Sequence, residues 1–323
     1  MATPIRIGVL GAANIARQFI AAVAPSALVT VTAIASRDAA KGAAFAKQTG
    51  VVRSFGSYEA MLADKDIDAV YNPLPNSLHA EWSIKAVQAG RHVLCEKPLA
   101  MSGAEARAMF DAARTNGVHL VEAYPYLAQP MTHHVCELVR SGAIGTPQLI
   151  RTSFGVPFSD TANIRLKPDV GGGSLMDAGS YAVSFVRVIA GARPKRVQAL
   201  ARWASTGVDL TLAGTLEFEN GLVAQIAGDA GTIDTMYLNH PPIGGPASIQ
   251  IRRGALAATS SIETIPVPEG NGFLLEAESF ARMITGGAGQ WNGATPEQSI
   301  DIAFTLEALL KAARTGLAVD VGA

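Results

Sequence analysis

The sequence predicts an α/β protein in two parts, an N-terminal doubly wound parallel sheet and a C-terminal α+β domain with a large, mainly antiparallel sheet. Through residue 123, short apolar runs alternate with stretches of helical periodicity, which is typical of a parallel sheet covered on both faces. After residue 149, longer strands with hairpin signals replace this pattern. The 323 residues exceed one typical domain, so we expect domains over 1–123 and 124–323.

Composition narrows the classes of function. The formal net charge of −1 leaves no basic excess for nucleic acid or an anionic membrane surface. Cys95 and Cys136 are too few for a disulfide framework, and no apolar run reaches the ~18 residues that a spanning helix needs. Met1 leads into the first strand without a signal-like segment. We therefore expect a cytoplasmic protein in a reducing compartment, with neither nucleic acid nor membrane as partner.

The first strand is expected over Ile5–Leu10, and it runs directly into Gly11-Ala12-Ala13-Asn14-Ile15-Ala16, where a helical pattern begins. Strand, glycine turn and helix in this order are the setting of a dinucleotide-binding fingerprint. Gly11 makes the tight turn, Ala13 stands where the second glycine admits the pyrophosphate, and Ala16 allows close packing of the helix. Ala13 departs from the G-x-G-x-x-G/A pattern, and an ordinary strand-to-helix turn is the alternative interpretation. The motif predicts an NAD(P)-binding Rossmann domain.

The end of the second strand, expected over Leu28–Ala35, bears on the choice of cofactor. An NAD-preferring site carries an acid there for the ribose hydroxyls, whereas this chain has Ser36-Arg37-Asp38. Arg37 can pair with a 2′-phosphate and stack on the adenine, and Ser36 adds a small donor. NADP is therefore expected rather than NAD. In the alternative interpretation Arg37 is a surface arginine and Asp38 reaches the ribose.

The next strands lead to an acid, a base and a proline. We expect helices over 39–49, 58–63, 79–89 and 102–116, and strands over 69–72, 92–95 and 119–123. The apolar strand from His92 ends in Glu96-Lys97-Pro98, and a proline cannot continue the ladder. Glu96 and Lys97 thus belong at the carboxyl edge of the sheet, where ligands bind in open α/β folds. A solvated charge pair in a loop is the alternative.

Taken together, these motifs resemble the Gfo/Idh/MocA oxidoreductases, which use NAD(P) on sugars, inositols and related polyols. The shared set is Gly11–Ala16, Ala35–Arg37, Pro75–His79 and Glu96–Pro98. The resemblance implies that the loop Pro73-Leu74-Pro75-Asn76-Ser77-Leu78-His79 lies against the nicotinamide side of the cofactor. It also implies that Lys97 is catalytic and that the Lys97–Pro98 peptide is often cis.

The most informative stretch of the second half is Gly171–Tyr181. Asp177 and Tyr181 are four residues apart and share one helical face, although helix capping and core packing would also explain them. The family carries a Gly-Gly-x-Leu-x-Asp-x-Gly-x-His/Tyr pattern that supplies further catalytic residues. Tyr181 at its last position resembles the branch of dimeric dihydrodiol dehydrogenases and NADP-dependent D-xylose 1-dehydrogenases. In that branch the position of Arg165 lies close to the cofactor.

Other parts of the second half give weaker signals. A helix is expected over Pro130–Ser141, and Asn220-Gly221 between 210–218 and 222–228 predicts a hairpin. The resemblance implies that the last helix, Pro296–Thr315, packs near the nucleotide domain. His133 and His134 are adjacent and diverge on a helix, so we expect no metal site.

These residues suggest hydride transfer between the nicotinamide and a carbinol carbon of a cyclic sugar or polyol. Oxidation needs a base for the hydroxyl proton, and a nearby ammonium favours the phenolate of a tyrosine. We expect Tyr181 to be the acid/base and Lys97 to tune it and orient the hydroxyl. With the roles exchanged, Lys97 itself carries the proton. Asp177 would position hydroxyls and hold Lys97, and Glu96 would fix the lysine at the strand end.

Three alternatives to an aldose 1-dehydrogenase stay open. A trans-dihydrodiol dehydrogenase would favour a flatter, more apolar pocket, which aromatic lining does not exclude; the candidates are Tyr124, Tyr126, Phe154 and Phe158. A sugar–sugar oxidoreductase would retain its NADP. A non-catalytic, NADP-responsive regulator is the third, and intact Lys97, Asp177 and Tyr181 argue against it. The resemblance further implies a homodimer or homotetramer.

Overall fold

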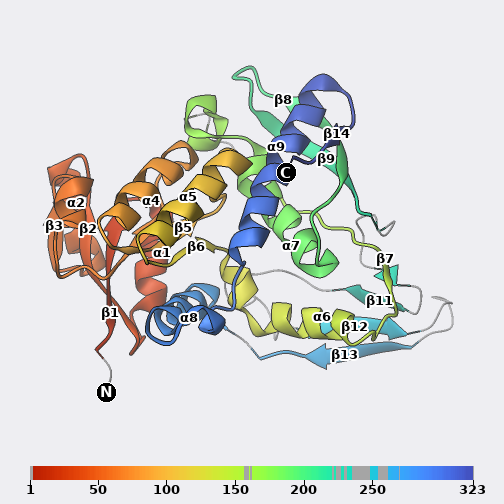
Figure 1. Cartoon of the computed structure of the whole chain (residues 1–323), viewed down its shortest axis with the longest axis horizontal. Coiled ribbons are helices and arrows are strands. Elements are labelled where there is room, and N and C mark those ends of the chain that lie inside the picture. The colour runs from red at the N-terminus through yellow and green to blue at the C-terminus, as the bar shows by residue number, and fades with distance from the viewer. Residues whose placement is uncertain are drawn as a thin grey trace. The chain divides into compact units, whose positions relative to one another are not determined.

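Figure 1 shows the computed structural model of the chain, which describes residues 3–155, 160, 162–219, 222, 227–228, 231–234, 248–253, 261–268 and 270–322. The chain forms two compact units. The first consists of Met1–Ala100, Glu105–Ala128 and Asn271–Pro296, and the second of Met101–Ala104, Gln129–Gly270 and Glu297–Ala323. These units differ from the expected division at residue 123, because Met101–Ala104 belong to the second unit, and residues 124–128 and Asn271–Pro296 belong to the first.

The first unit contains a six-stranded sheet whose paired strands are all parallel. Its strands are β1 (Ile5–Leu10), β2 (Val29–Ala35), β3 (Arg53–Phe55), β4 (Ala69–Asn72), β5 (His92–Glu96) and β6 (Leu120–Ala123). Their order is β3-β2-β1-β4-β5-β6. Successive strands are therefore added on one side of β1 up to β3 and on its other side from β4, while all strands stay parallel. Such a switch point opens a ligand crevice at the carboxyl ends of the strands. The predicted doubly wound sheet is confirmed.

Helices connect these strands and close the first unit. They are α1 (Asn14–Val23), α2 (Ala39–Thr49), α3 (Tyr58–Leu62), α4 (His79–Gln88), α5 (Gly103–Thr115) and α8 (Gly272–Gly286), with short 3₁₀ turns η1 (Asn76–Leu78), η2 (Pro125–Ala128) and η6 (Ala288–Gln290). Asp38 and Ser57 cap α2 and α3 by accepting a backbone N–H. Gly50 ends α2 in the left-handed conformation.

Helix α8 joins the first unit because its apolar face completes that unit's core. Phe273, Ala277 and Phe280 are at most 1% exposed and belong to the cluster that contains Phe19 and Tyr71. The Phe19 and Tyr71 rings stack with centroids 4.0 Å apart. Burying a phenylalanine is worth roughly 1.5–3 kcal/mol, which binds this distant segment to the sheet. In Figure 1, α8 lies beside α1.

The second unit is built on antiparallel pairs. Among the described residues, one sheet has the order β13-β12-β11-β10-β7 and another has the order β14-β8-β9. The strands are β7 (Pro147–Leu149), β8 (Arg196–Trp203), β9 (Asp209–Glu217), β10 (Ala227–Gly228), β11 (Gly231–Asp234), β12 (Ser248–Arg253), β13 (Ile262–Pro266) and β14 (Val319–Asp320). The predicted α+β class with antiparallel sheets is confirmed.

The expected hairpin and last helix both lie in this unit. Asn220 and Gly221 are outside the described residues, but on either side of them the Phe218 amide donates to the Leu222 carbonyl over 3.4 Å. Helices of the unit are α6 (Pro130–Arg140), α7 (Ser180–Ala190) and α9 (Pro296–Thr315), with 3₁₀ turns η3 (Ile164–Leu166) and η4 (Pro168–Val170). The partly buried pair Arg187–Asp301, at 2.8 Å, ties α7 to α9. Helix α9 belongs to the second unit, and its Glu307 side chain accepts the Gly103 amide over 3.2 Å. The expected packing of this helix near the nucleotide domain stays a prediction.

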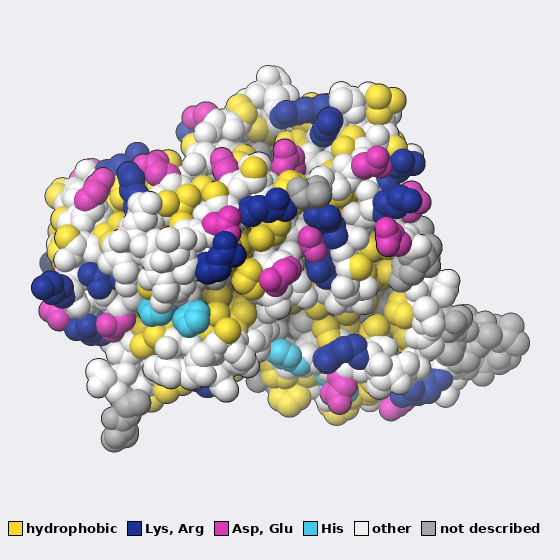
Figure 2. All heavy atoms as spheres, in the orientation of Figure 1, with side chains coloured by type: hydrophobic (Ala, Val, Ile, Leu, Met, Phe, Trp, Pro, Cys, Tyr) yellow, Lys and Arg dark blue, Asp and Glu magenta, His cyan; other side chains and the backbone are white. Residues whose placement is uncertain are grey.

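Charged side chains of both signs are interspersed on the face shown in Figure 2. Within the described ranges, no helix is both long enough and apolar enough to cross a membrane. In the same ranges, no three His, Cys, Asp or Glu side chains are grouped so that they would hold a metal ion.

Candidate active site

The loop from β1 to α1 presents helix-terminal amides to an anion. Gly11 has a φ of +87°, a conformation that favours glycine, and its N–H donates to the Ala35 carbonyl over 2.7 Å. Helix α1 follows Ala13, which supplies no side-chain cap, and its first turn has no acid. Uncapped amides at a helix N-terminus attract phosphate. The predicted fingerprint, Gly11 to Ile15, therefore fits the pyrophosphate of a dinucleotide.

At the end of β2 the structure separates the roles of Ser36, Arg37 and Asp38. The Asp38 carboxylate accepts the Lys41 amide over 3.0 Å and caps α2, while its own N–H donates to the Ser36 hydroxyl over 3.2 Å. Ser36 is buried, whereas Arg37 is exposed. A carboxylate engaged in capping is a poor ligand for ribose hydroxyls, whereas an exposed arginine is accessible to an anionic ligand.

The loop after β4, which includes Pro73, Leu74 and Asn76, is held by two buried side chains. Asn72 donates from Nδ2 to the Ser83 hydroxyl over 3.0 Å, and its Oδ1 accepts the Leu74 amide over 3.3 Å. The His79 ring lies with Nε2 2.7 Å from the Leu74 carbonyl and Nδ1 2.8 Å from the Pro98 carbonyl. Both ring nitrogens thus face backbone, and burial lowers the pKa of His79. His79 joins this loop to the next motif.

The Glu96-Lys97-Pro98 turn stands at the carboxyl end of β5, as its sequence predicts. Glu96 is buried; its Oε1 accepts the Tyr71 hydroxyl over 2.6 Å and its Oε2 accepts the Lys97 amide over 3.3 Å. Lys97 is partly exposed, and the Lys97–Pro98 peptide is cis. The sequence reading missed Tyr71, whose phenol anchors Glu96 from the neighbouring strand. The register Tyr71↔Leu94 places this phenol on the same sheet face as Glu96.

In the second unit, the glycines before α7 let two backbone segments meet. The Gly173 amide donates to the Arg165 carbonyl over 2.8 Å, and the Gly172 amide donates to the Lys167 carbonyl over 2.9 Å. A Cβ on Gly172 would overlap these carbonyls, and Gly173 has a φ of +120°. The close approach requires glycine at both positions. The 3₁₀ turn η3, which carries Arg165, is thereby fixed to the glycine loop.

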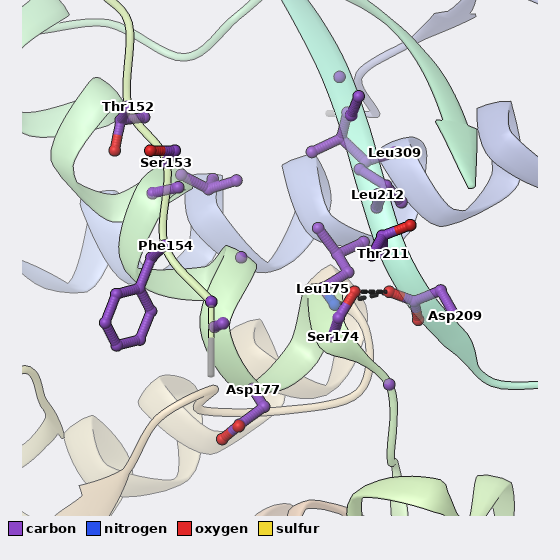
Figure 3. A pocket seen from close by; sticks show the side chains of 18 of the residues that line it. Thr152, Ser153, Phe154, Ser174, Leu175, Asp177, Asp209, Thr211, Leu212 and Leu309 are labelled. Atoms are coloured by element: carbon purple, nitrogen blue, oxygen red, sulfur yellow. Dashed lines mark hydrogen bonds between the residues drawn. The ribbon is translucent and has the colours of Figure 1, made fainter. Parts of the chain in front are cut away.

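Asp209 on β9 closes the same loop and was missed by sequence reasoning. Its Oδ2 accepts the Ser174 hydroxyl over 2.6 Å and the Leu175 amide over 2.7 Å, and the residue is 2% exposed. Figure 3 shows the Ser174–Asp209 bond beside the pocket. A buried carboxylate at a helix start satisfies orphan amides and complements the helix dipole. The sequence signal was an aspartate at the head of a predicted strand, which alone does not name its partner.

Asp177 lies in a π-helical turn, η5 (Leu175–Gly179), that leads into α7. Such turns are rare and frequent at functional sites. Its Oδ2 accepts Nε of Arg165 over 2.5 Å, with the two side chains 18% and 41% exposed. Two residues predicted for different roles, hydroxyl positioning and cofactor contact, are thus paired within the second unit.

Tyr181 is partly exposed on α7, and its ring meets Phe154 edge to face, with centroids 5.4 Å apart. A cavity of about 570 Å³ lies next to this turn in the second unit. Asp177 and Phe154 line it, while Tyr181 is not among its lining residues (Figure 3). Its polar lining includes Arg151, Thr152, Ser153 and Arg165; its apolar lining includes Leu175, Val183, Val186, Leu212, Leu216 and Leu309. The suggested aromatic residues Tyr124 and Tyr126 are buried in the first unit, and Phe158 is outside the described residues.

Comparison with known proteins agrees with both units. Residues 5–124 match the profile described as oxidoreductase family, NAD-binding Rossmann fold, and residues 132–235 match the GFO/IDH/MocA C-terminal domain. D-xylose 1-dehydrogenase (NADP⁺) 2 of Haloferax volcanii is 37% identical, with 97% of this chain and 99% of that protein covered.

Two further relatives broaden the comparison. Trans-1,2-dihydrobenzene-1,2-diol dehydrogenase of Xenopus laevis is 35% identical over 65% of this chain and 64% of its own length. A 3-ketoreductase from Actinomadura kijaniata, solved with NADP and TDP-benzene, superposes with a TM-score of 0.86 at 30% identity and covers 96% of this chain and 98% of its own. With both domain profiles matched and the xylose dehydrogenase aligned with 97% of this chain, the chain belongs to the Gfo/Idh/MocA family of oxidoreductases.

Proposed function

We propose that this protein is an NADP-dependent oxidoreductase that transfers hydride between nicotinamide C4 and a carbinol carbon of a cyclic sugar or polyol, in the manner of an aldose 1-dehydrogenase. The observation that carries the proposal is the 37% identity with a D-xylose 1-dehydrogenase along 97% of the chain. The relatives named above that act on sugars, and the NADP of the related 3-ketoreductase structure, support the same chemistry.

The end of β2 supports the choice of NADP. Asp38 is engaged as the cap of α2, and Arg37 is exposed beside it. A guanidinium binds a phosphate through charge-assisted hydrogen bonds, which are stronger than its hydrogen bonds to a neutral ribose hydroxyl. The amides of the Gly11–Ile15 loop would hold the pyrophosphate. The loop Pro73–His79 would border the nicotinamide, with His79 acting through the two carbonyls it contacts.

When bound, the nicotinamide supplies the hydride acceptor or donor, and the protein supplies proton transfer and orientation. We assign acid/base work to the Tyr181 phenol, because a phenol that hydrogen-bonds the substrate hydroxyl can take its proton as hydride leaves. The Lys97 ammonium favours the phenolate and orients the hydroxyl. The Asp177 carboxylate, aligned by Arg165, positions neighbouring hydroxyls. The converse assignment, with Lys97 as proton carrier, gives a different result for the Tyr181→Phe variant, because activity would then survive.

A second candidate function is oxidation of a trans-dihydrodiol. The relative from Xenopus laevis and the apolar part of the pocket lining favour it. A cyclic diol fused to an apolar ring buries more hydrocarbon than a sugar does, and an apolar wall would stabilise it. A third possibility, exchange of hydride between two sugars with retained cofactor, would leave NADP(H) bound through purification.

We also propose a cytoplasmic homodimer or homotetramer. In the described residues both cysteines are free thiols, Cys95 buried and Cys136 partly buried, which suits a reducing compartment. Leu200 on β8 is 77% exposed, which leaves an apolar side chain on this sheet for a second copy to cover. Light scattering on the purified chain measures the oligomeric state.

The test of the function is steady-state reduction of NADP⁺, with NAD⁺ alongside, across aldopyranoses, inositols and a trans-cyclohexanediol. Strong activity on one aldose with NADP⁺ is the expected result. Activity on the cyclohexanediol alone would favour the dihydrodiol function. Silence on the whole panel with NADP(H) bound tightly would point to the cofactor-retaining enzyme or to a regulator.

A further inference from the structure

Glu276 is an acidic side chain buried inside the first unit. It lies on α8 and is 1% exposed, and the same helix carries Phe273, Ala277 and Phe280 of the hydrophobic core. Neither of its carboxyl oxygens makes a hydrogen bond of ordinary geometry with the described residues. Burial of a carboxyl group without partners is costly, so this position requires a physical explanation.

The groups that act on Glu276 come from the strand ends that carry the Lys97 turn. Burial, then the charges of Glu96 on β5 and Glu122 on β6, raise the pKa of Glu276 well above its ordinary value of 4.5. A hydrogen bond from the Tyr124 backbone, too poorly aligned to count as one of ordinary geometry, lowers the pKa by less than burial and the two charges raise it. Helix α8 packs against η2, the turn that follows β6, and against α1, where the Phe19 ring lies 6.5 Å from that of Phe273.

The two glutamates that face Glu276 hold the turn on both sides of Pro98. Glu96 accepts the Lys97 amide over 3.3 Å, and Glu122 accepts the Leu99 amide over 2.9 Å. Glu122 is 1% exposed and Glu96 is 7% exposed, so both acceptors work in a medium of low dielectric. A third negative charge at Glu276 would repel both of them strongly there.

We propose that Glu276 is a positioning residue for the Lys97 turn: it stays protonated in the working enzyme, and its ionisation at alkaline pH displaces Glu96 and with it the turn. The inference rests on the proposed function, in which Lys97 acts on the substrate hydroxyl. It gives α8 a role beyond packing, because the helix supplies a neutral acid that acts on Glu96 and Glu122, the two side chains that hold the Lys97 turn.

The first test measures thermal unfolding against pH and needs no substrate. The unfolded chain loses the Glu276 proton above a pH of about 4.5, whereas the folded chain keeps it. The stability that this difference contributes is therefore fully present below a pH of about 4.5. That contribution is lost as pH rises through the raised pKa of the folded state. Glu276→Gln cannot ionise at this position. Its melting temperature should therefore fall less between about pH 6 and about pH 9 than that of the wild type, because the loss of stability grows with the difference between the folded and unfolded pKa values.

Glu278→Gln is the matched control, because Glu278 lies on the same helix, accepts the Ser26 hydroxyl over 2.8 Å and is partly exposed. It should keep the wild-type slope. Parallel melting profiles for the wild type and Glu276→Gln would overturn the inference.

The second test measures kcat against pH. Glu276→Gln should move the alkaline limit of kcat to higher pH, because the neutral amide mimics the protonated acid. Glu276→Ala should lower kcat by about 10- to 100-fold with little change in the KM for NADP⁺, as expected when a reacting group is misplaced. An unchanged alkaline limit in Glu276→Gln would refute the role. If the wild type is active but Glu276→Gln has the same melting profile, this inference is wrong and the proposed function stands. If the wild type is inactive on the substrate panel but the melting profiles differ as expected, the proposed function is wrong and the effect of Glu276 on stability stands.

Discussion

Arg165 donates through Nε to Asp177 Oδ2 over 2.5 Å, and the carbonyl of the same arginine accepts the Gly173 amide over 2.8 Å. The arginine is therefore fixed at its backbone and at its side chain to the segment that starts α7. A charge-assisted hydrogen bond of this kind sets the orientation of the carboxylate as well as its charge. Asp177 is thereby aligned before any substrate arrives.

Removal of this partner should disturb the use of substrate more than stability. Arg165→Ala is expected to lower kcat/KM for the sugar by about 10- to 100-fold, because the Asp177 carboxylate loses its fixed orientation. The melting temperature should change little, since a half-exposed ion pair contributes about 1 kcal/mol or less. Arg253→Gln, which removes the exposed pair Arg253–Glu263 of the same unit, is the control and should leave kcat/KM unchanged. Equal effects of the two variants would count against the alignment.

Lys97→Met should separate catalysis from cofactor binding. The substitution keeps a side chain of similar length and removes the ammonium, so kcat is expected to fall by about 10²- to 10⁴-fold. NADPH affinity, measured by fluorescence titration, should stay near the wild-type value because the Gly11–Ile15 loop and Arg37 are untouched. Lys85→Met, which removes the exposed Lys85–Glu81 pair on α4, is the control. A fully active Lys97→Met enzyme would remove Lys97 from the mechanism.

Cofactor preference should depend on Arg37 and not on Asp38. Arg37→Ala is expected to raise the KM for NADP⁺ roughly 10-fold or more and to leave the KM for NAD⁺ nearly unchanged, since a charge-assisted pair with phosphate is lost. Asp38→Ser keeps a capping oxygen and should retain both stability and preference. Asp38→Ala should lose about 1 kcal/mol of stability without a change of preference. A gain in NADP⁺ preference on loss of Asp38 would show that this carboxylate does reach the ribose.

The pair His92 and His119 should make the fold sensitive to acid. Nδ1 of His92 accepts the His119 amide over 3.0 Å, and burial followed by the charge of His119 lowers the pKa of His92 from 6.5 to about 4. The unfolded chain binds a proton at His92 below a pH of about 6.5, whereas the folded chain binds it only below a pH of about 4. Stability contributed by neutral His92 is therefore lost as pH falls through this window.

His92→Asn tests this window, because Oδ1 of asparagine can replace the acceptor nitrogen but does not titrate. Its melting temperature should fall less than that of the wild type between pH 6.5 and 4, the two limits set for His92. His134→Asn, on α6 of the second unit, serves as the control. A wild-type slope in His92→Asn would exclude this histidine as the source of acid sensitivity.

The parts of the fold that follow from local pattern were predicted closely. The run Ile5–Leu10 followed by Gly11 fixed the first strand and turn, and Glu96-Lys97-Pro98 fixed the end of β5, because buried strands and prolines leave strong marks in a sequence. Strand β3, with three residues, has no such mark. The sequence of α8 has the apolar spacing of an amphipathic helix, but the partner of its apolar face is a property of the folded core.

The candidate site shows the same limit. Lys97, Asp177 and Tyr181 came from motifs, whereas the partners that orient them came only from the structure. The strand register brings Tyr71 to Glu96, and Asp209 contacts Ser174 from strand β9. Arg165 pairs with Asp177 because its carbonyl is held by the Gly173 amide. Each partner depends on long-range geometry that spacing along the chain does not encode. The family resemblance is confirmed, and the individual roles of the residues stay proposals.

The most direct test of the central claim is transfer of deuterium from C1 of a labelled aldose to NADP⁺, carried out with the wild type and with Tyr181→Phe. We expect the wild type to form nicotinamide labelled at C4 together with the oxidised sugar, and Tyr181→Phe to form it at least about 100-fold more slowly. Labelled cofactor formed equally fast by both enzymes would contradict the assignment of Tyr181. Failure of the wild type to label NADP⁺ from any aldose of the panel would contradict the proposed activity itself.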